Sequence, residues 1–246
     1  MSRGDRQEAI YRDQTDCETF LETLGQACER TGWLVHCLVL MGNHWHGLIE
    51  TPEPNLSIGM KWLHSTYTQR FNRRHKECGH LFQGRYRSLL IDPDAEEYFL
   101  TVSNYIHLNP ARAKQITLKN GDLLNYPWSS YPSYIRTRKR PEWLCVDRVL
   151  GCWRLDDDRS GRMQYRRGMQ AYVDELRGIN KPWAYDPDWS KIRRGWFWGS
   201  DEFGRGLLDK LEGVRSKTKL DSLGGEAIRL HNEHQAKQLK QPNDAV

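Results

Sequence analysis

The chain has 246 residues, of which 28% are charged and 38% hydrophobic, and its mean hydropathy is −0.81. This length can bury a sizeable core, so we expect one domain of about 100 to 150 residues with an extension. The sequence has no run of about 18 apolar residues and no secretory signal, which argues against a membrane protein. The six cysteines are scattered without a C-x-x-C pair, so we expect a cytoplasmic protein with reduced thiols.

The net charge of +5 is unevenly distributed along the chain. Residues 1–60 contain nine acidic side chains and four arginines, whereas residues 61–90 contain seven basic side chains and only one acidic residue, Glu77. Segregated positive charge is typical of a surface that binds a polyanion. A solvated helix face would give the same pattern, so charge alone leaves both interpretations open.

The first predicted helix spans residues 15–32. Thr15 and Glu18 match the capping box, in which two side chains satisfy main-chain amides at the start of a helix. Gly32 follows the last apolar residue of the pattern, at the place where a left-handed residue commonly ends a helix.

Two strands and a second helix are predicted next. Residues 33–41 are apolar and β-rich, residues 44–50 resume a strand pattern, and the Gly42-Asn43 pair between them is a turn signal. The two strands should therefore form an antiparallel hairpin. A long amphipathic helix follows Asn55, which is its expected N-cap.

Beyond this helix we expect one or two strands in residues 80–92 and a third helix from Pro93 to about Asn109. Pro110 sets that end because proline disfavours helical geometry in the residue before it. The order of elements predicts an α+β domain in which helices pack on an antiparallel sheet. From about residue 125 the pattern becomes irregular and rich in tryptophan, and residues 200–240 have a polar helical pattern.

His44, Trp45 and His46 lie together in the second predicted strand. Strand side chains alternate between faces, so both histidines should project from one face and Trp45 from the other. Two imidazoles on one face can bind a transition-metal ion. An isolated H-x-H triplet also occurs in ordinary packing, so it needs a second element.

That second element is the segment from Ser103 to Pro110. Tyr105 and Asn109 are four residues apart and share a face if the segment is helical. The amide oxygen of Asn109 can then act as a third metal ligand, and the Tyr105 hydroxyl can attack a phosphodiester. The alternative is that Tyr105 is a core residue and that Asn109 only ends the helix.

Four segments, in order, resemble the REP-associated tyrosine transposases, a group within the insertion-sequence single-tyrosine transposases. The segments are L-M-G-N-H-W-H-G-L-I-E-T-P, S-T-Y-T-Q-R-F-N-R-R-H, G-H-L-F-Q-G-R-Y-R-S and Y-I-H-L-N-P-A-R-A. The resemblance runs from about Ser2 to Tyr131. It implies a ferredoxin-like HUH domain with helices on one face of the sheet, a divalent cation (Mg or Mn), cleavage of single-stranded DNA beside hairpins, and a 5′-phosphotyrosine intermediate.

The resemblance also implies roles for individual residues. His44 and His46 match the metal ligands, and Tyr105 matches the nucleophile. Asn109 takes the position of a third ligand, where the wider group often has glutamine. The basic residues that become candidates for DNA contact are Lys61, Arg70, Arg73, Arg74, Arg85, Arg87 and Arg112.

The chain departs from the group at its start. Members usually have a Y-H-V strand before an S-R-G-[DN]-R segment, whereas here Met1 is followed directly by residues 2–6, S-R-G-D-R. We therefore expect a sheet that lacks its first strand. The predicted domains are an N-terminally truncated HUH domain at 1–135, an extension of loops and helices at 136–240, and a disordered tail at 241–246.

The leading hypothesis is metal-dependent cleavage and strand transfer of single-stranded DNA at hairpin-forming repeats. One alternative is a catalytically silent remnant that binds DNA hairpins without cutting them. Another is a metallohydrolase of small phosphodiesters that uses bound water in place of tyrosine. The wider group contains dimers that exchange tyrosines between chains, but a monomer is expected here, with a homodimer as the alternative.

Overall fold

The computed structural model describes residues 1–116, 121–177 and 197–218. The chain forms two compact units, one of Met1–Ser88 with Phe99–Pro187 and one of Leu89–Tyr98 with Asp188–Val246. The predicted boundary at residue 135 stays a prediction, and the predicted tail at 241–246 lies outside the described residues. In the part of the chain that is described, no helix has the length and apolar character needed to cross a membrane.

A three-stranded antiparallel sheet forms the centre of the first unit, with strand order β1-β3-β2. β2 (Leu34–Met41) and β3 (His44–Glu50) are the two arms of the predicted hairpin, which is confirmed. β1 (Ser2–Arg3) pairs with the other side of β3. The chain order strand-helix-strand-strand-helix, followed by an extended segment beside β1, is that of a ferredoxin-like domain.

A strand of two residues, β1, pairs with β3 at the edge of the sheet where the first strand was expected to be missing. The predicted N-terminal truncation stays a prediction. Residues 81–87 run along its outer side. The amide of Gln83 donates to the carbonyl oxygen of Arg3, and Met1 and Arg87 exchange two hydrogen bonds of 2.9 Å. The sheet is thereby extended beyond β1 by an irregular segment.

The predicted strands in residues 80–92 are only partly present. An isolated antiparallel bridge joins Phe82 to Gly4, and the pairing shifts at Gly84, where a φ of +60° makes the segment bulge. β4 (Leu90–Ile91) belongs to the second unit, where it pairs in parallel with β5 (Phe197–Trp198). A glycine in a strand pattern thus interrupts the ladder.

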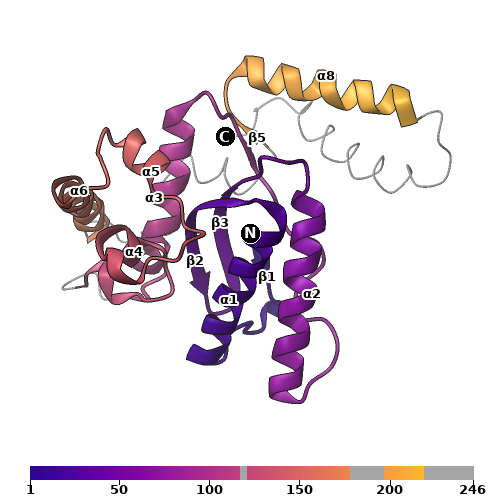
Figure 1. Cartoon of the computed structure of the whole chain (residues 1–246), viewed down its shortest axis with the longest axis horizontal. Helices are drawn as coiled ribbons and strands as arrows, with labels where there is room; N and C mark the ends of the chain where they lie inside the picture. Colours follow the sequence, from indigo (N-terminus) through magenta and orange to yellow (C-terminus); the bar gives the residue numbers. More distant parts are fainter. Residues whose placement is uncertain (117–120, 178–196, 219–246) are drawn as a thin grey trace. The chain divides into compact units, whose positions relative to one another are not determined.

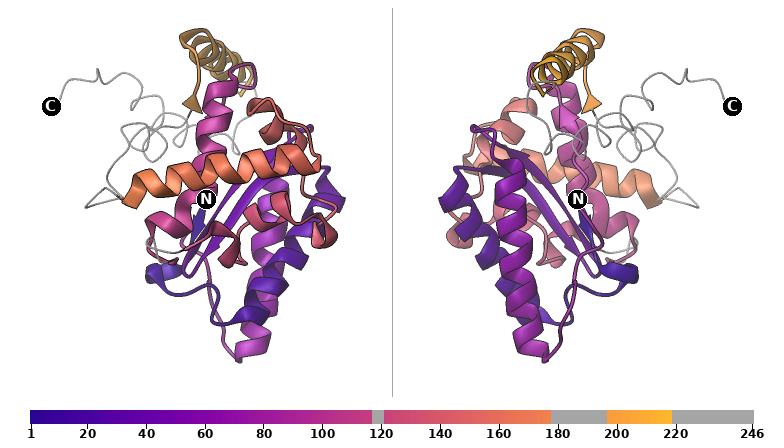
Figure 2. Two further views of the ribbon diagram at one scale, coloured as in Figure 1. Left: turned by 90° about the vertical axis from the view of Figure 1, so that its left-hand side faces the viewer. Right: turned by 90° about the vertical axis from the view of Figure 1, so that its right-hand side faces the viewer.

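α1 (Gln14–Thr31) and α2 (Leu56–His75) lie side by side on one face of the sheet (Figure 1, Figure 2). Phe20 of α1, Leu63 and Tyr67 of α2 and Trp45 of β3 are buried together in one apolar core. This confirms the amphipathic helices that the sequence predicted and the inward direction of Trp45.

The first helix begins one residue earlier than predicted. Its N-cap is Asp13, whose carboxylate accepts a hydrogen bond from the amide of Asp16. Thr15 therefore lies inside the first turn. Gly32 ends the helix with a left-handed φ of +69°, as the sequence predicted.

α3 (Glu96–Arg112) lies on the other side of the sheet from α1 and α2, so helices cover both faces of the sheet (Figure 2). The helix continues through Pro110 rather than ending at Asn109. Proline at this position removes one hydrogen bond near the end of the helix, and the amide of Ala113 still donates to the Asn109 carbonyl oxygen at 2.8 Å. The residues of α3 from Val102 onward are buried.

The described part of the predicted extension packs on α3 and on the edge of β2. It contains α5 (Asp147–Cys152) and α6 (Arg159–Arg177), and α4 (Tyr131–Ile135) lies directly before it in the chain. The main chain on either side of Ser129 covers the edge of β2, since Leu40 donates to Trp128 and Ser130 donates to Leu38, both at 2.8 Å. An uncovered edge strand would be open to pairing with another chain.

The second unit contains the helix α8 (Asp201–Thr218), in agreement with the helical pattern predicted for residues 200–240 as far as the structure describes them. Asp92 accepts hydrogen bonds from the amide and the hydroxyl of Ser200, at 3.1 and 2.8 Å. These bonds hold the pKa of Asp92 below its ordinary value, against the opposing effect of desolvation.

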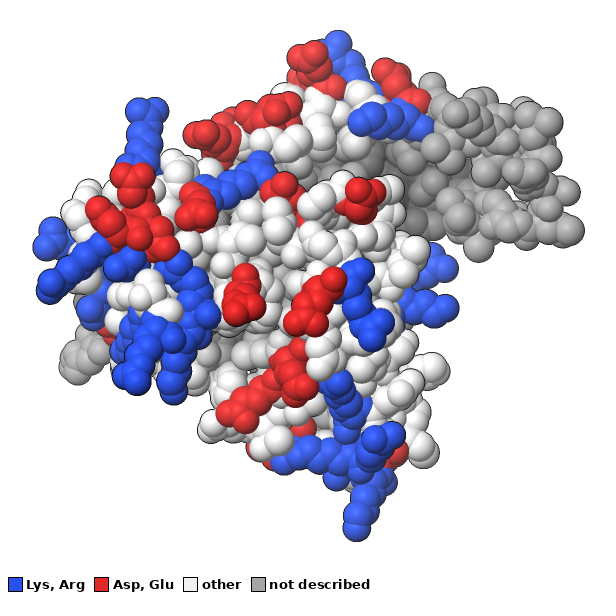
Figure 3. Space-filling model, viewed as in Figure 1, with Lys and Arg blue, Asp and Glu red and all other residues white. Residues whose placement is uncertain are grey.

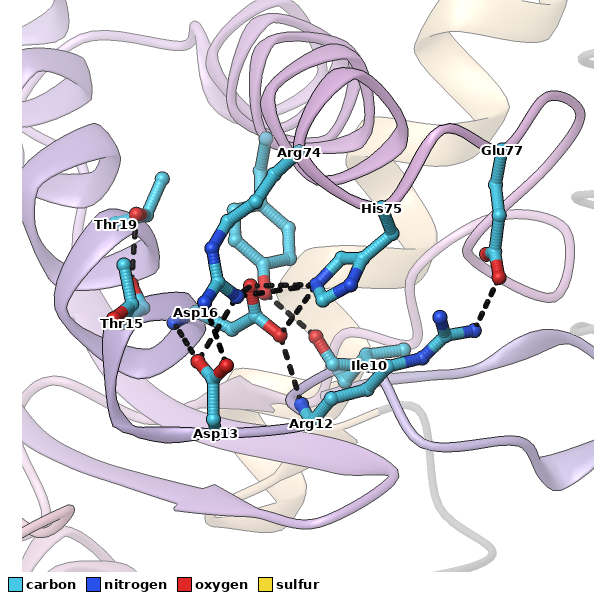
Figure 4. Close-up of polar contacts among 10 residues, drawn as sticks. Ile10, Arg12, Asp13, Thr15, Asp16, Thr19, Arg74, His75 and Glu77 are labelled. Atoms are coloured by element: carbon cyan, nitrogen blue, oxygen red, sulfur yellow. Dashed lines mark hydrogen bonds and ion pairs between the residues drawn. The ribbon is translucent and has the colours of Figure 1, made fainter.

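An ionic cluster joins the start of α1 to the end of α2 (Figure 4). Asp16, with a side chain only 2% exposed, accepts hydrogen bonds from Arg74 at 2.6 Å, from His75 at 2.9 Å and from the amide of Arg12 at 2.9 Å. Arg74 also pairs with Asp13 at 2.6 Å, which lowers the pKa of Asp13 and raises that of Arg74. Arg74 therefore stabilises the packing of the two helices.

We expect Arg74→Gln to lower the free energy of unfolding, because Asp16 would stay buried with its charge less compensated. Arg73→Gln, at the neighbouring exposed position, is the matched control and should change stability by less than about 0.5 kcal/mol. Chemical denaturation measures both variants. Equal stability of the two would show that Arg74 contributes nothing to the fold.

Candidate active site between a strand and a buried helix

β3 presents His44 and His46 on the sheet face that is turned away from α1 and α2. Trp45 between them is 1% exposed and belongs to the core on the opposite face. The two imidazole rings lie with their centroids 5.1 Å apart and their planes at 82°. Strand alternation thus produces the predicted histidine pair.

The turn before β3 orients the first histidine. The side-chain amide of Asn43 donates to the carbonyl oxygen of Gln7 at 3.1 Å, so its oxygen faces His44 and accepts from Nδ1 at 2.7 Å. A proton held on Nδ1 leaves Nε2 in the deprotonated form that binds a metal ion. The sequence identified Asn43 only as a turn residue and gave no signal for this second role.

α3 brings Tyr105 to the same face of the sheet. The centroid of its ring lies 5.4 Å from that of His46, with the ring planes at 72°. The Tyr105 side chain is 5% exposed. The histidine pair and the tyrosine therefore come together from a strand and a helix that are separated by all of α2.

Asn109 follows Tyr105 by one helical turn, as predicted. Its Nδ2 donates to the Tyr105 carbonyl oxygen at 3.1 Å. This bond directs the amide nitrogen toward the helix, so the amide oxygen is the atom that can coordinate a ligand. In the described residues no group of three or more His, Cys, Asp or Glu side chains could hold a metal. A cation here would thus depend on the two imidazoles and an oxygen such as that of Asn109, which is a compatible set of donors.

His107 points away from the site, as its two-residue separation from Tyr105 leads one to expect. Its Nδ1 shares a hydrogen bond of 2.8 Å with the Tyr165 hydroxyl of α6, and its Nε2 shares one of 2.8 Å with the Ser130 hydroxyl. The Ser130 oxygen also accepts from the amide of Leu38 in β2. Burial lowers the pKa of His107 to about 3, so the ring is neutral and ties α3 to its neighbours.

The basic residues predicted to contact DNA fall into two groups. Arg70 donates to Thr23 and Gln26 of α1, at 2.8 and 2.9 Å, and Arg74 binds the ionic cluster described above. Arg112 is only 8% exposed, so it does not lie on the surface where a DNA contact was expected. Lys61, Arg73, Arg85 and Arg87 are exposed, and Arg74 is exposed as well although it is held in the ionic cluster.

A second group of basic side chains lies in the predicted extension. Figure 3 shows lysine and arginine gathered over the region of α4 to α6, with acidic side chains beside them. Arg136, Arg138 and Lys139 are exposed, whereas Arg140 pairs with Asp157.

Residues 3–109 match the model of a known family, described as "Transposase IS200 like". This segment is therefore similar to that family over somewhat less than half of the chain. It contains all four proposed site residues: His44, His46, Tyr105 and Asn109. One solved structure that matches is the "Structure of the REP associates tyrosine transposase bound to a REP hairpin", with 12% identity, 60% of this chain and 82% of that chain covered, and a TM-score of 0.41. No curated protein matches the chain.

The buried His107 of α3 should make the protein sensitive to acid. The folded state holds this ring neutral with a pKa of about 3, whereas an unfolded histidine titrates near about 6.5. The unfolded state therefore binds the additional proton, and stability should fall as the pH decreases below about 6.5, by up to about 1.4 kcal/mol per pH unit.

Denaturation with urea between about pH 7.5 and 5 measures this slope. We expect His107→Gln to be less stable at neutral pH but to lose less stability on acidification than the wild type. The exposed His80→Gln variant should keep the wild-type slope. Because burial also lowers the pKa of His64 to about 4, part of the slope should remain in His107→Gln. An unchanged slope in His107→Gln would contradict this assignment.

Proposed function

We propose that the chain cleaves and rejoins single-stranded DNA beside hairpins, with Tyr105 as the nucleophile, in DNA transposition. The observation that supports this most directly is the contact between Tyr105 and His46 of the same chain, inside an IS200-like transposase domain. The sequence resemblance of the four segments supports hairpin-forming DNA as the substrate.

The proposed reaction exchanges one ester for another. The Tyr105 oxygen attacks the phosphorus, the bond from phosphorus to the 3′ oxygen breaks, and a 5′-phosphotyrosine forms. The phenolic proton is lost as the new bond forms, and the departing 3′ oxygen gains a proton to leave as a hydroxyl. A phenol has an ordinary pKa of about 10, so its proton must be removed near neutral pH. A second 3′-hydroxyl can reverse the reaction and join a new strand.

We further propose a divalent cation, Mg or Mn, bound by His44, His46 and Asn109. A cation bound there would withdraw negative charge from the scissile phosphate. The hydrogen bond from His44 to Asn43 supports this proposal because ligating histidines commonly hold their second nitrogen in such a bond.

A monomer is the form that we propose for catalysis. Tyr105 contacts the histidine of its own chain, so one chain supplies both halves of the site. The alternative dimer, in which tyrosines are exchanged, would require this contact to form between two chains.

Tyr105→Phe should abolish the covalent protein–DNA adduct that the wild type forms with a hairpin flanked by single strands in the presence of Mn. The change removes only the attacking oxygen and should leave hairpin affinity within about threefold. Tyr98→Phe is the matched control and should keep the adduct. Denaturing gel electrophoresis of labelled DNA measures the adduct, and its survival in Tyr105→Phe would show that another group is the nucleophile.

The wild type also separates the alternatives. Binding of the hairpin with no adduct would identify a catalytically silent binding protein. Hydrolysis of a small phosphodiester that persists in Tyr105→Phe would identify a metallohydrolase that uses water.

Mixing two inactive variants tests the monomer. A His44→Ala/His46→Ala chain keeps its tyrosine, and a Tyr105→Phe chain keeps its histidines. If each chain forms its own site, the mixture should form no adduct above the background of either variant alone. Adduct at about a quarter to a half of the wild-type level would instead show that tyrosines are exchanged between chains.

A further inference from the structure

A basic hollow of about 340 Å³ lies at the edge of the sheet in the first unit. Its wall contains three arginines and a glutamine side chain, supplied by β1 and by the extended segment beside it. The lining residues are Met1, Ser2, Arg3, Gln83, Arg85 and Arg87. In this described set there is no carboxylate, so the hollow is a concentrated positive charge.

Strand register places the hollow on the same sheet face as the histidine pair. Arg3 lies directly opposite His44, and Ser2 opposite Trp45. Residues opposite each other in an antiparallel pair project from the same face, with Cβ atoms about 5 Å apart. Arg3 therefore shares the face of His44, while the buried Ser2 shares that of Trp45.

The outer segment follows the same alternation. Phe82 and Tyr86 pack on the core formed with α1 and α2, and the Tyr86 hydroxyl bonds to Ser57 of α2 at 3.1 Å. The odd-numbered residues between and beyond them, Gln83, Arg85 and Arg87, line the hollow instead. They therefore lie on the same face of the sheet as Arg3, His44 and His46.

The spacing suits a chain of phosphates. Adjacent strands lie about 4.8 Å apart, so the hollow begins one strand beyond the histidines and ends about two strands beyond them. This distance corresponds to a few nucleotides at most, given about 3.4 Å per nucleotide along a stacked strand. A single strand that reacts at Tyr105 therefore needs only a few nucleotides to span the distance from His44 to the hollow.

These arginines also differ from those of α2 in their protein contacts. Arg70 and Arg74 are held by side chains of α1 or by carboxylates near its start. Arg3, Arg85 and Arg87 are exposed, and in the described part of the chain no acidic side chain pairs with them. A fold does not need three adjacent guanidinium groups, which repel each other, whereas guanidinium groups match the geometry of phosphate oxygens.

We propose that the hollow formed by Arg3, Arg85 and Arg87 binds backbone phosphates of the single-stranded segment next to the bond that is cleaved. The inference rests on the proposed function, which brings a single strand to His44 and Tyr105. It assigns the hollow to positioning the strand without reading its sequence, because phosphate contacts are the same for every base.

Fluorescence anisotropy tests the hollow in a Tyr105→Phe background, where binding is measured without cleavage. The probes are a labelled hairpin with a single-stranded flank and the same hairpin without it. The triple change Arg3→Gln, Arg85→Gln and Arg87→Gln should weaken binding of the flanked hairpin by about tenfold or more and reduce its salt dependence by about 0.7 in log–log slope for each lost phosphate contact. Binding of the flankless hairpin should change by less than about twofold.

A second triple variant controls for net charge. Arg30→Gln, Arg159→Gln and Arg167→Gln remove the same charge from exposed positions on α1 and α6. This variant should bind both probes like its parent. Circular dichroism and urea denaturation should show that both triple variants fold normally, since all six side chains are exposed.

Three results would overturn the proposal: no loss of affinity, an equal loss for both probes, or an equal loss in the control variant. None of them depends on cleavage. Conversely, a wild type that forms no adduct while the hollow still favours the flanked probe would contradict the proposed function and leave the hollow's role in binding intact.

Discussion

The burial of α3 between the sheet and the helices of the extension is the constraint on which the site depends. His107 has no exposed surface, and both of its ring nitrogens are bonded, one to Tyr165 and one to Ser130. A rotation of α3 would leave these groups buried without partners, at a cost of about 1–3 kcal/mol for each. Because Tyr105 is only two residues away on the same rigid helix, this bonding also fixes the direction of Tyr105 toward β3.

The two faces of the sheet differ in role: one packs on α1 and α2, and the other carries the residues of the candidate site. Trp45, Ser2 and Phe82 face the core of α1 and α2, and each is followed or preceded by a residue on the other face: the histidine pair, Arg3 and Gln83. The period of two along a strand produces this division with no additional interaction.

The charge of a basic residue in the sequence does not show whether that residue stabilises the fold or is exposed on the surface. Arg73 and Arg74 are neighbours of equal charge, yet Arg74 binds two aspartates of α1 and Arg73 is exposed. Helical geometry points adjacent side chains about 100° apart, so one meets the neighbouring helix and the other meets solvent. Arg112 is buried because α3 is covered on both sides. The arginines of the hollow, by contrast, follow strand alternation on an open edge.

Local rules acting on the sequence determined the hairpin, the shared face of His44 and His46, the helical placement of Tyr105 and Asn109, and the family resemblance, because each depends on neighbours within a few residues. The same rules misplaced the N-cap at Thr15, ended α3 at Asn109 and overextended the strands in 80–92, where Asp13 capping, tertiary burial and the bulge at Gly84 decided the outcome. Only the tertiary structure decided that Tyr105 meets His46 of its own chain and that Arg3 lies beside His44. Those contacts join segments far apart along the chain, and their geometry is set by the packing of whole layers.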